Sequence, residues 1–133
     1  MPTPAEDVLA CNRRLLEAVA AGDWSAYREL VAEDITCFEP EARGHLVEGL
    51  PFHEFYFRLS GGSSRPAAPV TTTLATPVVK MLGDDVALVA YVRLVQKLDA
   101  AGSPVTTCCE ETRVWRRMAT GWKHVHFHRS IPG

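Results

Sequence analysis

The sequence lacks the features that mark secreted, membrane-spanning and nucleic-acid-binding proteins. Its N-terminus has no basic segment followed by an apolar one, so we expect no signal peptide. No apolar run approaches the roughly 18 residues of a membrane span. The net charge is only −2, which gives no global attraction to nucleic acid or to an anionic membrane. We therefore expect a cytoplasmic protein.

The cysteines show no metal-binding spacing, and the alternating histidines, whose spacing can bind metal, do not favour a site. No CxxC pair occurs, and the adjacent Cys108 and Cys109 would point to opposite faces of a strand. We interpret all four cysteines as small apolar residues in a reducing compartment. His124, His126 and His128 alternate along one predicted strand, but their rings would be spread over about 13 Å. We expect no metal site and no cofactor.

The length and composition fit one domain that covers residues 1–133. A chain of 133 residues can bury roughly two-thirds of its unfolded surface, which is enough for a core without metals or disulfides. Hydrophobic residues make up 47% of the chain and charged residues 23%, both ordinary for a globular protein.

Helical patterns come first along the chain. A capping box at Thr3–Glu6 predicts a helix over about 4–21. Asp23 caps a second, shorter helix. A third is predicted over roughly 51–59, and because its side chains are aromatic nearly all round, we expect most of it to be buried.

Strand patterns dominate the rest of the chain. Two short strands are predicted at 35–39 and 45–47, and a Gly/Ser-rich stretch at 60–66 is interpreted as a mobile lid or rim. The apolar period then becomes strand-like and predicts four long strands, at 70–82, 86–98, 105–118 and 122–130. Helices first and strands last indicate an α+β fold, with the helices packed into one face of a curved antiparallel sheet that forms a cone.

The last two strands form a predicted hairpin that carries arginines at positions suited to core residues. Arg113 and Arg129 alternate with Trp115, Val125 and Phe127. An arginine stays charged at any cellular pH, and an unpaired buried charge is very costly. These side chains must therefore reach water or have anionic partners.

The length of the hairpin loop decides which residues face each other. A three-residue loop would place Arg113 opposite Arg129 and Trp115 opposite Phe127, whereas a loop of two or four would align Arg113 with His128. We favour the three-residue loop because it gives one consistent core face. The opposite face then looks like a subunit interface and carries His124, His126 and His128.

Two opposed arginines repel each other unless an anion lies between them. One candidate is a protein carboxylate, with Glu111 on the same face and Glu39 or Glu41 as further choices. The other candidate is a bound ligand. The residues alone leave both interpretations open.

Four segments together resemble the association (hub) domain of calcium/calmodulin-dependent protein kinase II: FEPEARGHLVEGLPFHEFYF, AYVRLVQKLDAAGSP, EETRVWRR and GWKHVHFHRS. The resemblance runs from about Leu15 to Ser130. It implies a nuclear transport factor 2-like cone fold that forms dimers through the sheet and, in the kinases, larger rings. It also implies a deep pocket that holds a carboxylate and is lined by Arg93, Arg113, Arg129 and His53.

The chain departs from those kinases in two respects. It has no kinase domain or calmodulin-binding segment, so no calcium control is implied. The stretch 60–66 has no tryptophan where the kinases carry one, which affects the mouth of the pocket. We expect a stand-alone association domain that binds copies of itself and a small carboxylate. The expected ligand-binding residues are Arg93, Arg113, Arg129, His53, Tyr91 and Glu111, with none catalytic.

Two alternatives remain open. One is an enzyme of the same cone fold, an isomerase, cyclase or dehydratase, with His53, Glu39, Glu111 and Tyr91 as acid or base. The other is a protein-binding adaptor whose pocket is vestigial.

Overall fold

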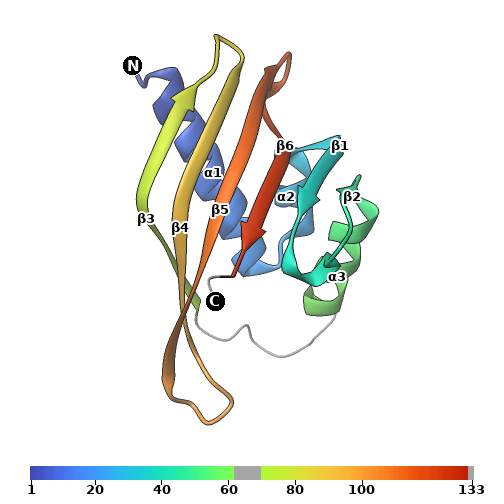
Figure 1. Ribbon diagram of the computed structural model, residues 1–133, viewed down its shortest axis with the longest axis vertical. Helices are drawn as coiled ribbons and strands as arrows, with labels where there is room; N and C mark the ends of the chain where they lie inside the picture. Colours follow the sequence, from blue (N-terminus) through green and yellow to red (C-terminus); the bar gives the residue numbers. More distant parts are fainter. Residues whose placement is uncertain (62–69, 132–133) are drawn as a thin grey trace.

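The computed structural model describes residues 1–61 and 70–131. Helices pack on one face of a curved sheet (Figure 1). The elements in chain order are α1 (Pro4–Ala21), α2 (Trp24–Leu30), β1 (Val31–Phe38), a 3₁₀ turn η1 (Pro40–Ala42), β2 (Val47–Glu48), α3 (Pro51–Gly61), β3 (Val70–Met81), β4 (Val86–Leu98), β5 (Pro104–Met118) and β6 (Gly121–Ser130). The α+β class predicted from the sequence is confirmed. The predicted lid lies outside the described residues from residue 62 onward.

Local signals place α1 as predicted. Thr3 Oγ1 accepts a hydrogen bond from the backbone N–H of Glu6 at 3.2 Å, and Gly22 ends the helix with a φ of 67° that favours glycine. Leu15 of this helix is fully buried against the sheet. No helix in the described part of the chain is long and apolar enough to cross a membrane.

The prediction that α3 is mostly buried is wrong. His53 is buried and Phe52 and Phe57 are half-buried, but Phe55 and Leu59 are exposed. One side of the helix packs on α2 and, through His53, on Cys37 and Phe127 of the sheet, so its aromatic composition overstates its burial.

The sheet has the strand order β2-β1-β6-β5-β4-β3. Strands β3 to β6 form the antiparallel meander expected from the sequence. β1 joins the meander beside β6 in parallel orientation, so the complete sheet is mixed. In Figure 1, α1 runs behind the long strands and α2 and α3 lie beside β1 and β2, which leaves the other face of the sheet turned to the viewer.

The hairpin register differs from the predicted one. Met118 pairs with Gly121, so the loop has two residues instead of three. A β-bulge shifts the register between Val114 and Trp115, which pair with His126 and His124.

Beyond the bulge, Arg113 lies opposite Phe127 and Glu111 lies opposite Arg129. The predicted pairing of Arg113 with Arg129 is therefore wrong. The extra residue on β6, Val125, changes which positions of that strand face inward. An alternating pattern does not reveal a bulge, and here the bulge keeps Arg113, Phe127 and Arg129 on the inner face despite the shorter loop.

Candidate functional site

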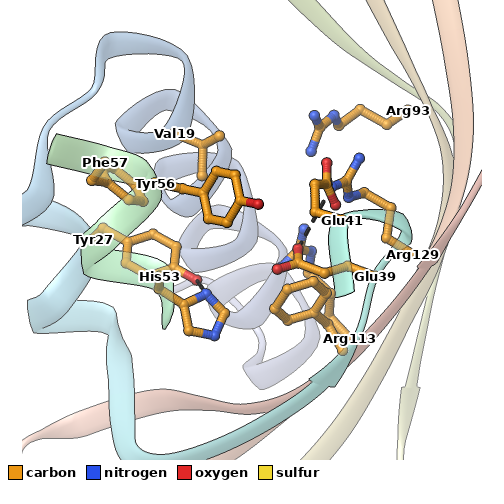
Figure 2. Close-up of a pocket in the computed structure, with 11 residues that line it drawn as sticks. Val19, Tyr27, Glu39, Glu41, His53, Tyr56, Phe57, Arg93, Arg113 and Arg129 are labelled. Atoms are coloured by element: carbon orange, nitrogen blue, oxygen red, sulfur yellow. Dashed lines mark hydrogen bonds and ion pairs between the residues drawn. The ribbon is translucent and has the colours of Figure 1, made fainter. Parts of the chain in front are cut away.

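A cavity of about 260 Å³ lies between the helices and the inner face of the sheet. Figure 2 shows its two walls facing each other, one aromatic and carried by helices, the other charged and carried mainly by strands and η1. The lining residues are Val19, Tyr27, His53, Tyr56 and Phe57 on the helices, with Glu39, Glu41, Arg93, Arg113, Phe127 and Arg129 opposite. The structure thus brings together the three predicted arginines and His53.

Arg113 is buried and its charge is compensated. Its Nε donates to Tyr91 Oη at 2.9 Å and its Nη2 donates to Glu111 Oε1 at 3.1 Å. The guanidinium lies over the Phe127 ring, 4.4 Å from the centroid. Burial opposes the charge, but Glu111 and Tyr91 outweigh it and raise the pKa of Arg113. Arg113 therefore belongs to the framework of the cavity as much as to its lining.

Glu111 is the protein carboxylate that pairs with Arg113, one of the partners considered from the sequence. It accepts hydrogen bonds from Tyr91 Oη at 2.6 Å and from Arg93 Nη1 at 2.8 Å, as well as from Arg113. Burial alone would raise its pKa, but Arg113 and Arg93 outweigh burial and hold the pKa of Glu111 below its usual value. Glu111 and Tyr91 lie behind the guanidinium of Arg113, outside the lining of the cavity.

Tyr91 joins this cluster to α1. Its hydroxyl donates to Glu111 and accepts from Asn12 Nδ2 at 3.0 Å, while Asn12 Oδ1 accepts from Trp115 Nε1 at 3.0 Å. All of these groups are buried, so each polar atom needs the partner it has. The sequence analysis missed Asn12, although a polar residue on the apolar side of a helix was the available signal.

Arg129 lines the cavity between two carboxylates. Its Nη2 contacts the Glu41 carboxylate and lies 3.5 Å from Glu39 Oε2. The side chain of Glu39 is 12% exposed and that of Glu41 is 37% exposed. Burial and the neighbouring Glu41 raise the pKa of Glu39, and Arg129 opposes this shift. Arg129 therefore pairs with two carboxylates, of which Glu39 is largely buried and Glu41 is exposed.

Arg93 keeps spare donor capacity. Its Nη1 pairs with Glu111, but its Nε is buried without a hydrogen-bond partner among the described residues. Its side chain is partly exposed to the cavity. The Nε itself has almost no accessible surface, so an acceptor from outside reaches it only if the side chain moves.

His53 is held by two neighbours. Its Nδ1 lies 3.2 Å from Tyr27 Oη, and its Nε2 lies 3.8 Å from Cys37 Sγ. Burial raises the pKa of Tyr27, so this hydroxyl keeps its proton, and either tautomer of the His53 ring can share a hydrogen bond with it. Burial, helped by Arg113, lowers the pKa of His53 to about 4. His53 is thus a neutral ring with both nitrogens engaged, which makes it a weak base toward a cavity ligand.

The three alternating histidines separate into two environments. His124, predicted on the outer face, is fully buried between Trp115 and Phe127, and burial lowers its pKa well below the usual value. His126 and His128 lie on the outer face as predicted, where His126 Nδ1 is 2.7 Å from Thr36 Oγ1. Within residues 1–61 and 70–131, no three side chains are grouped to hold a metal ion.

The charges around the cavity balance. Three guanidiniums, of Arg93, Arg113 and Arg129, are compensated by the carboxylates of Glu39, Glu41 and Glu111. An anion entering the cavity must therefore compete with a protein carboxylate.

An α+β cone of this kind defines a nuclear transport factor 2-like (NTF2-like) domain. A solved NTF2-like protein of unknown function from Pseudomonas putida has the same fold, with a TM-score of 0.76 and 21% identity over 96% of this chain and 86% of that one. A sequence profile of the calcium/calmodulin dependent protein kinase II association domain matches residues 4–133. The chain belongs to this association domain family, which confirms the resemblance noted from the sequence.

Two relatives show how close the match is. The delta subunit of calcium/calmodulin-dependent protein kinase type II from Oryctolagus cuniculus is 43% identical over 125 residues, 94% of this chain. The chain spans 23% of the length of that kinase subunit. The solved hub homology domain of C. reinhardtii has a TM-score of 0.86 and 48% identity, covering 98% of this chain and all of that one.

Proposed function

We propose that this domain joins copies of itself through the outer face of its sheet. The observation that carries the proposal is a row of neighbouring outward residues across five strands. Strand register places Val78 beside Ala90, Ala90 beside Thr112, Thr112 beside His128, and His128 beside Phe38.

This row is apolar at both ends. Val78 is 49% exposed and Phe38 is 43% exposed, and the adjacent row adds Leu88 and Val114. The described helices pack on the opposite face, so this surface faces solvent in a single chain (Figure 1). Exposed apolar surface of this extent, mixed with hydroxyl and imidazole groups, is typical of subunit interfaces.

A second copy suits this face better than an unrelated partner. A sheet face that meets itself across a two-fold axis brings equal patches together, so a neutral row such as this one avoids like-charge repulsion. Charged side chains of this face, Lys80 and Glu110, lie in the neighbouring rows. The family is named for association, which agrees with the proposal. Light scattering of the purified protein tests it: we expect at least twice the chain mass of 14.7 kDa, and a monomeric mass would contradict it.

We further propose that the cavity binds a small carboxylate through Arg93 and Arg129. Three features support this second function. Arg93 lines the cavity and its side chain is partly exposed, Arg129 lines the cavity as well, and Glu41, which contacts Arg129, is exposed enough to turn into solvent. A guanidinium offers two parallel donors to a carboxylate, which makes arginine the suitable side chain. Arg113 contributes mainly by holding Glu111 and the Phe127 wall.

Thermal-shift measurements with a series of small monocarboxylates test the cavity. We expect the wild type and Arg117→Gln to be stabilised equally, because Arg117 pairs with Asp85 on the exposed surface. Arg129→Gln should lose most of the shift. Equal shifts in all three proteins would exclude carboxylate binding at this site.

Catalysis has weaker support than binding. His53 is engaged by Tyr27 and Cys37, and Glu111 and Tyr91 lie behind Arg113. Of the four acid–base candidates named from the sequence, Glu39 offers a lining carboxyl whose pKa is raised. A single such group does not define a reaction, so we place binding first.

A further inference from the structure

The two walls of the cavity differ in chemistry in a way that constrains its ligand. Tyr27 and Phe57 form part of the aromatic wall, and Arg129, Glu39 and Glu41 stand across the cavity from them (Figure 2). A ligand that fills this space needs an apolar part at one end and charged groups at the other.

A simple carboxylate that bound Arg129 would leave Glu39 without its cationic partner. Glu39 lies 3.5 Å from Arg129, and its side chain is only 12% exposed. When a ligand carboxylate takes Arg129, Glu41 can turn to solvent because it is 37% exposed, but Glu39 is held in the cavity wall. A largely buried carboxylate without a cationic partner is costly, so the ligand itself must bring a positive group or a proton.

We propose that the natural ligand is a zwitterionic α-amino acid with an apolar side chain, and that Glu39 binds its ammonium group. The inference rests on the proposed carboxylate site and names the class of ligand that fits it. The carboxylate pairs with Arg129 and Arg93, and the side chain packs on the aromatic wall.

The charge balance of the cavity agrees with this class. Its cations and anions already compensate each other, and a zwitterion adds no net charge, whereas a monocarboxylate adds one negative charge. An α-amino acid carries its two charged groups on neighbouring carbons, which matches a guanidinium and a carboxylate that are themselves neighbours. Inserting the ligand replaces the two ion pairs of Arg129, with Glu39 and with Glu41, by two charge-assisted pairs with the ligand and leaves Glu41 in solvent.

Matched probes separate the ammonium group from the rest of the ligand. L-phenylalanine and 3-phenylpropanoate share a carboxylate and a phenyl group and differ in the ammonium, and 2-phenylethylamine lacks the carboxylate. L-leucine and 4-methylpentanoate form a second pair that does not depend on a phenyl ring fitting. Titration calorimetry on the full chain compares the dissociation constants of these probes at mildly alkaline pH, which favours the ionised form of Glu39 against its raised pKa.

We expect each amino acid to bind the wild type about tenfold more tightly than its deaminated partner, and phenylethylamine to bind more weakly than L-phenylalanine. Glu39→Gln should weaken the amino acids about tenfold and leave the plain carboxylates equal or tighter. Glu41→Gln is the matched control, because its side chain reaches solvent, and it should keep the preference for amino acids.

Each outcome is decisive. If the plain carboxylates bind the wild type as tightly as the amino acids, and Arg129→Gln abolishes both, the carboxylate site stands and the zwitterion inference fails. If neither class binds, the proposed carboxylate site fails and the inference fails with it. If Glu39→Gln does not fold, as judged by circular dichroism, the wild-type ranking of the matched pairs still decides the question.

Discussion

Arg113 and Glu111 form an ion pair inside the domain, with 3.1 Å between Nη2 and Oε1 and side-chain exposures of 4% and 0%. The pair is joined to Tyr91 and through it to α1. It explains how a strand can carry an arginine toward the core. It also means that the anion required by Arg113 is supplied by the protein itself.

Glu111→Gln should strongly destabilise the fold. It removes the charge that compensates buried Arg113, and breaking one partner of a buried pair costs about 3–5 kcal/mol of unfolding free energy. Urea unfolding followed by tryptophan fluorescence measures the loss. Glu6→Gln, on the surface of α1, is the control and should change stability by less than about 0.5 kcal/mol. Similar losses in the two variants would show that Arg113 does not depend on Glu111.

Tyr91→Phe should destabilise the domain without changing its state of assembly. The hydroxyl donates to Glu111 and accepts from Asn12 and Arg113, so its removal leaves buried groups without partners. We expect a loss of about 2 kcal/mol, since each unsatisfied buried group costs about 1–3 kcal/mol. Differential scanning calorimetry checks the stability and light scattering checks the mass. An unchanged melting temperature would contradict the network.

Because of His124, we expect the domain to become less stable as the pH is lowered. The pKa of His124 is lowered in the folded state, so below about pH 6.5 the unfolded chain binds a proton that the folded chain does not. When the pH falls from about 7.5 to about 5, protonation of this ring in the unfolded chain should lower the unfolding free energy by about 2 kcal/mol. His53, with a pKa lowered to about 4, adds a loss of the same sign.

His124→Leu isolates that contribution. The variant should lose about 2 kcal/mol less than the wild type between about pH 7.5 and pH 5, because leucine takes up no proton in the unfolded chain. Glu39, whose pKa is raised, acts in the opposite direction but is common to both proteins. Urea unfolding at the two pH values measures the difference, and parallel losses would show that His124 is protonated in the folded state.

The sequence was sufficient for the arrangement of helices before strands, which follows from local signals, namely capping residues and strand alternation. The set of Arg93, Arg113 and Arg129 came from the family resemblance, because alternation along the hairpin combined with its true two-residue loop would have separated Arg113 from Arg129. The parallel pairing of β1 with β6 did not follow, because these strands are far apart in the chain and nothing local records their contact.

The β-bulge beside Trp115 also left no sequence signal, and this is why the inward position of His124 was missed. Alternation assumes that each residue has one partner, and a single extra residue reverses the faces beyond it. The sequence could not decide which anion pairs with Arg113, because Glu111 and a bound ligand would compensate its charge equally well. The strand register of the structure was needed to identify Glu111.

Val92→Glu tests the proposed interface most directly. Val92 points outward from β4 between Ala75 and Glu110, and a charge placed there opposes burial against a second copy. Ala10→Glu adds the same charge on the exposed side of α1 and serves as the control.

Sedimentation velocity of the wild type, Ala10→Glu and Val92→Glu at one concentration gives the answer. We predict that the wild type and Ala10→Glu sediment as the same oligomer, and that Val92→Glu sediments as a folded monomer. An oligomer of unchanged size in Val92→Glu would contradict assembly through the outer face of the sheet.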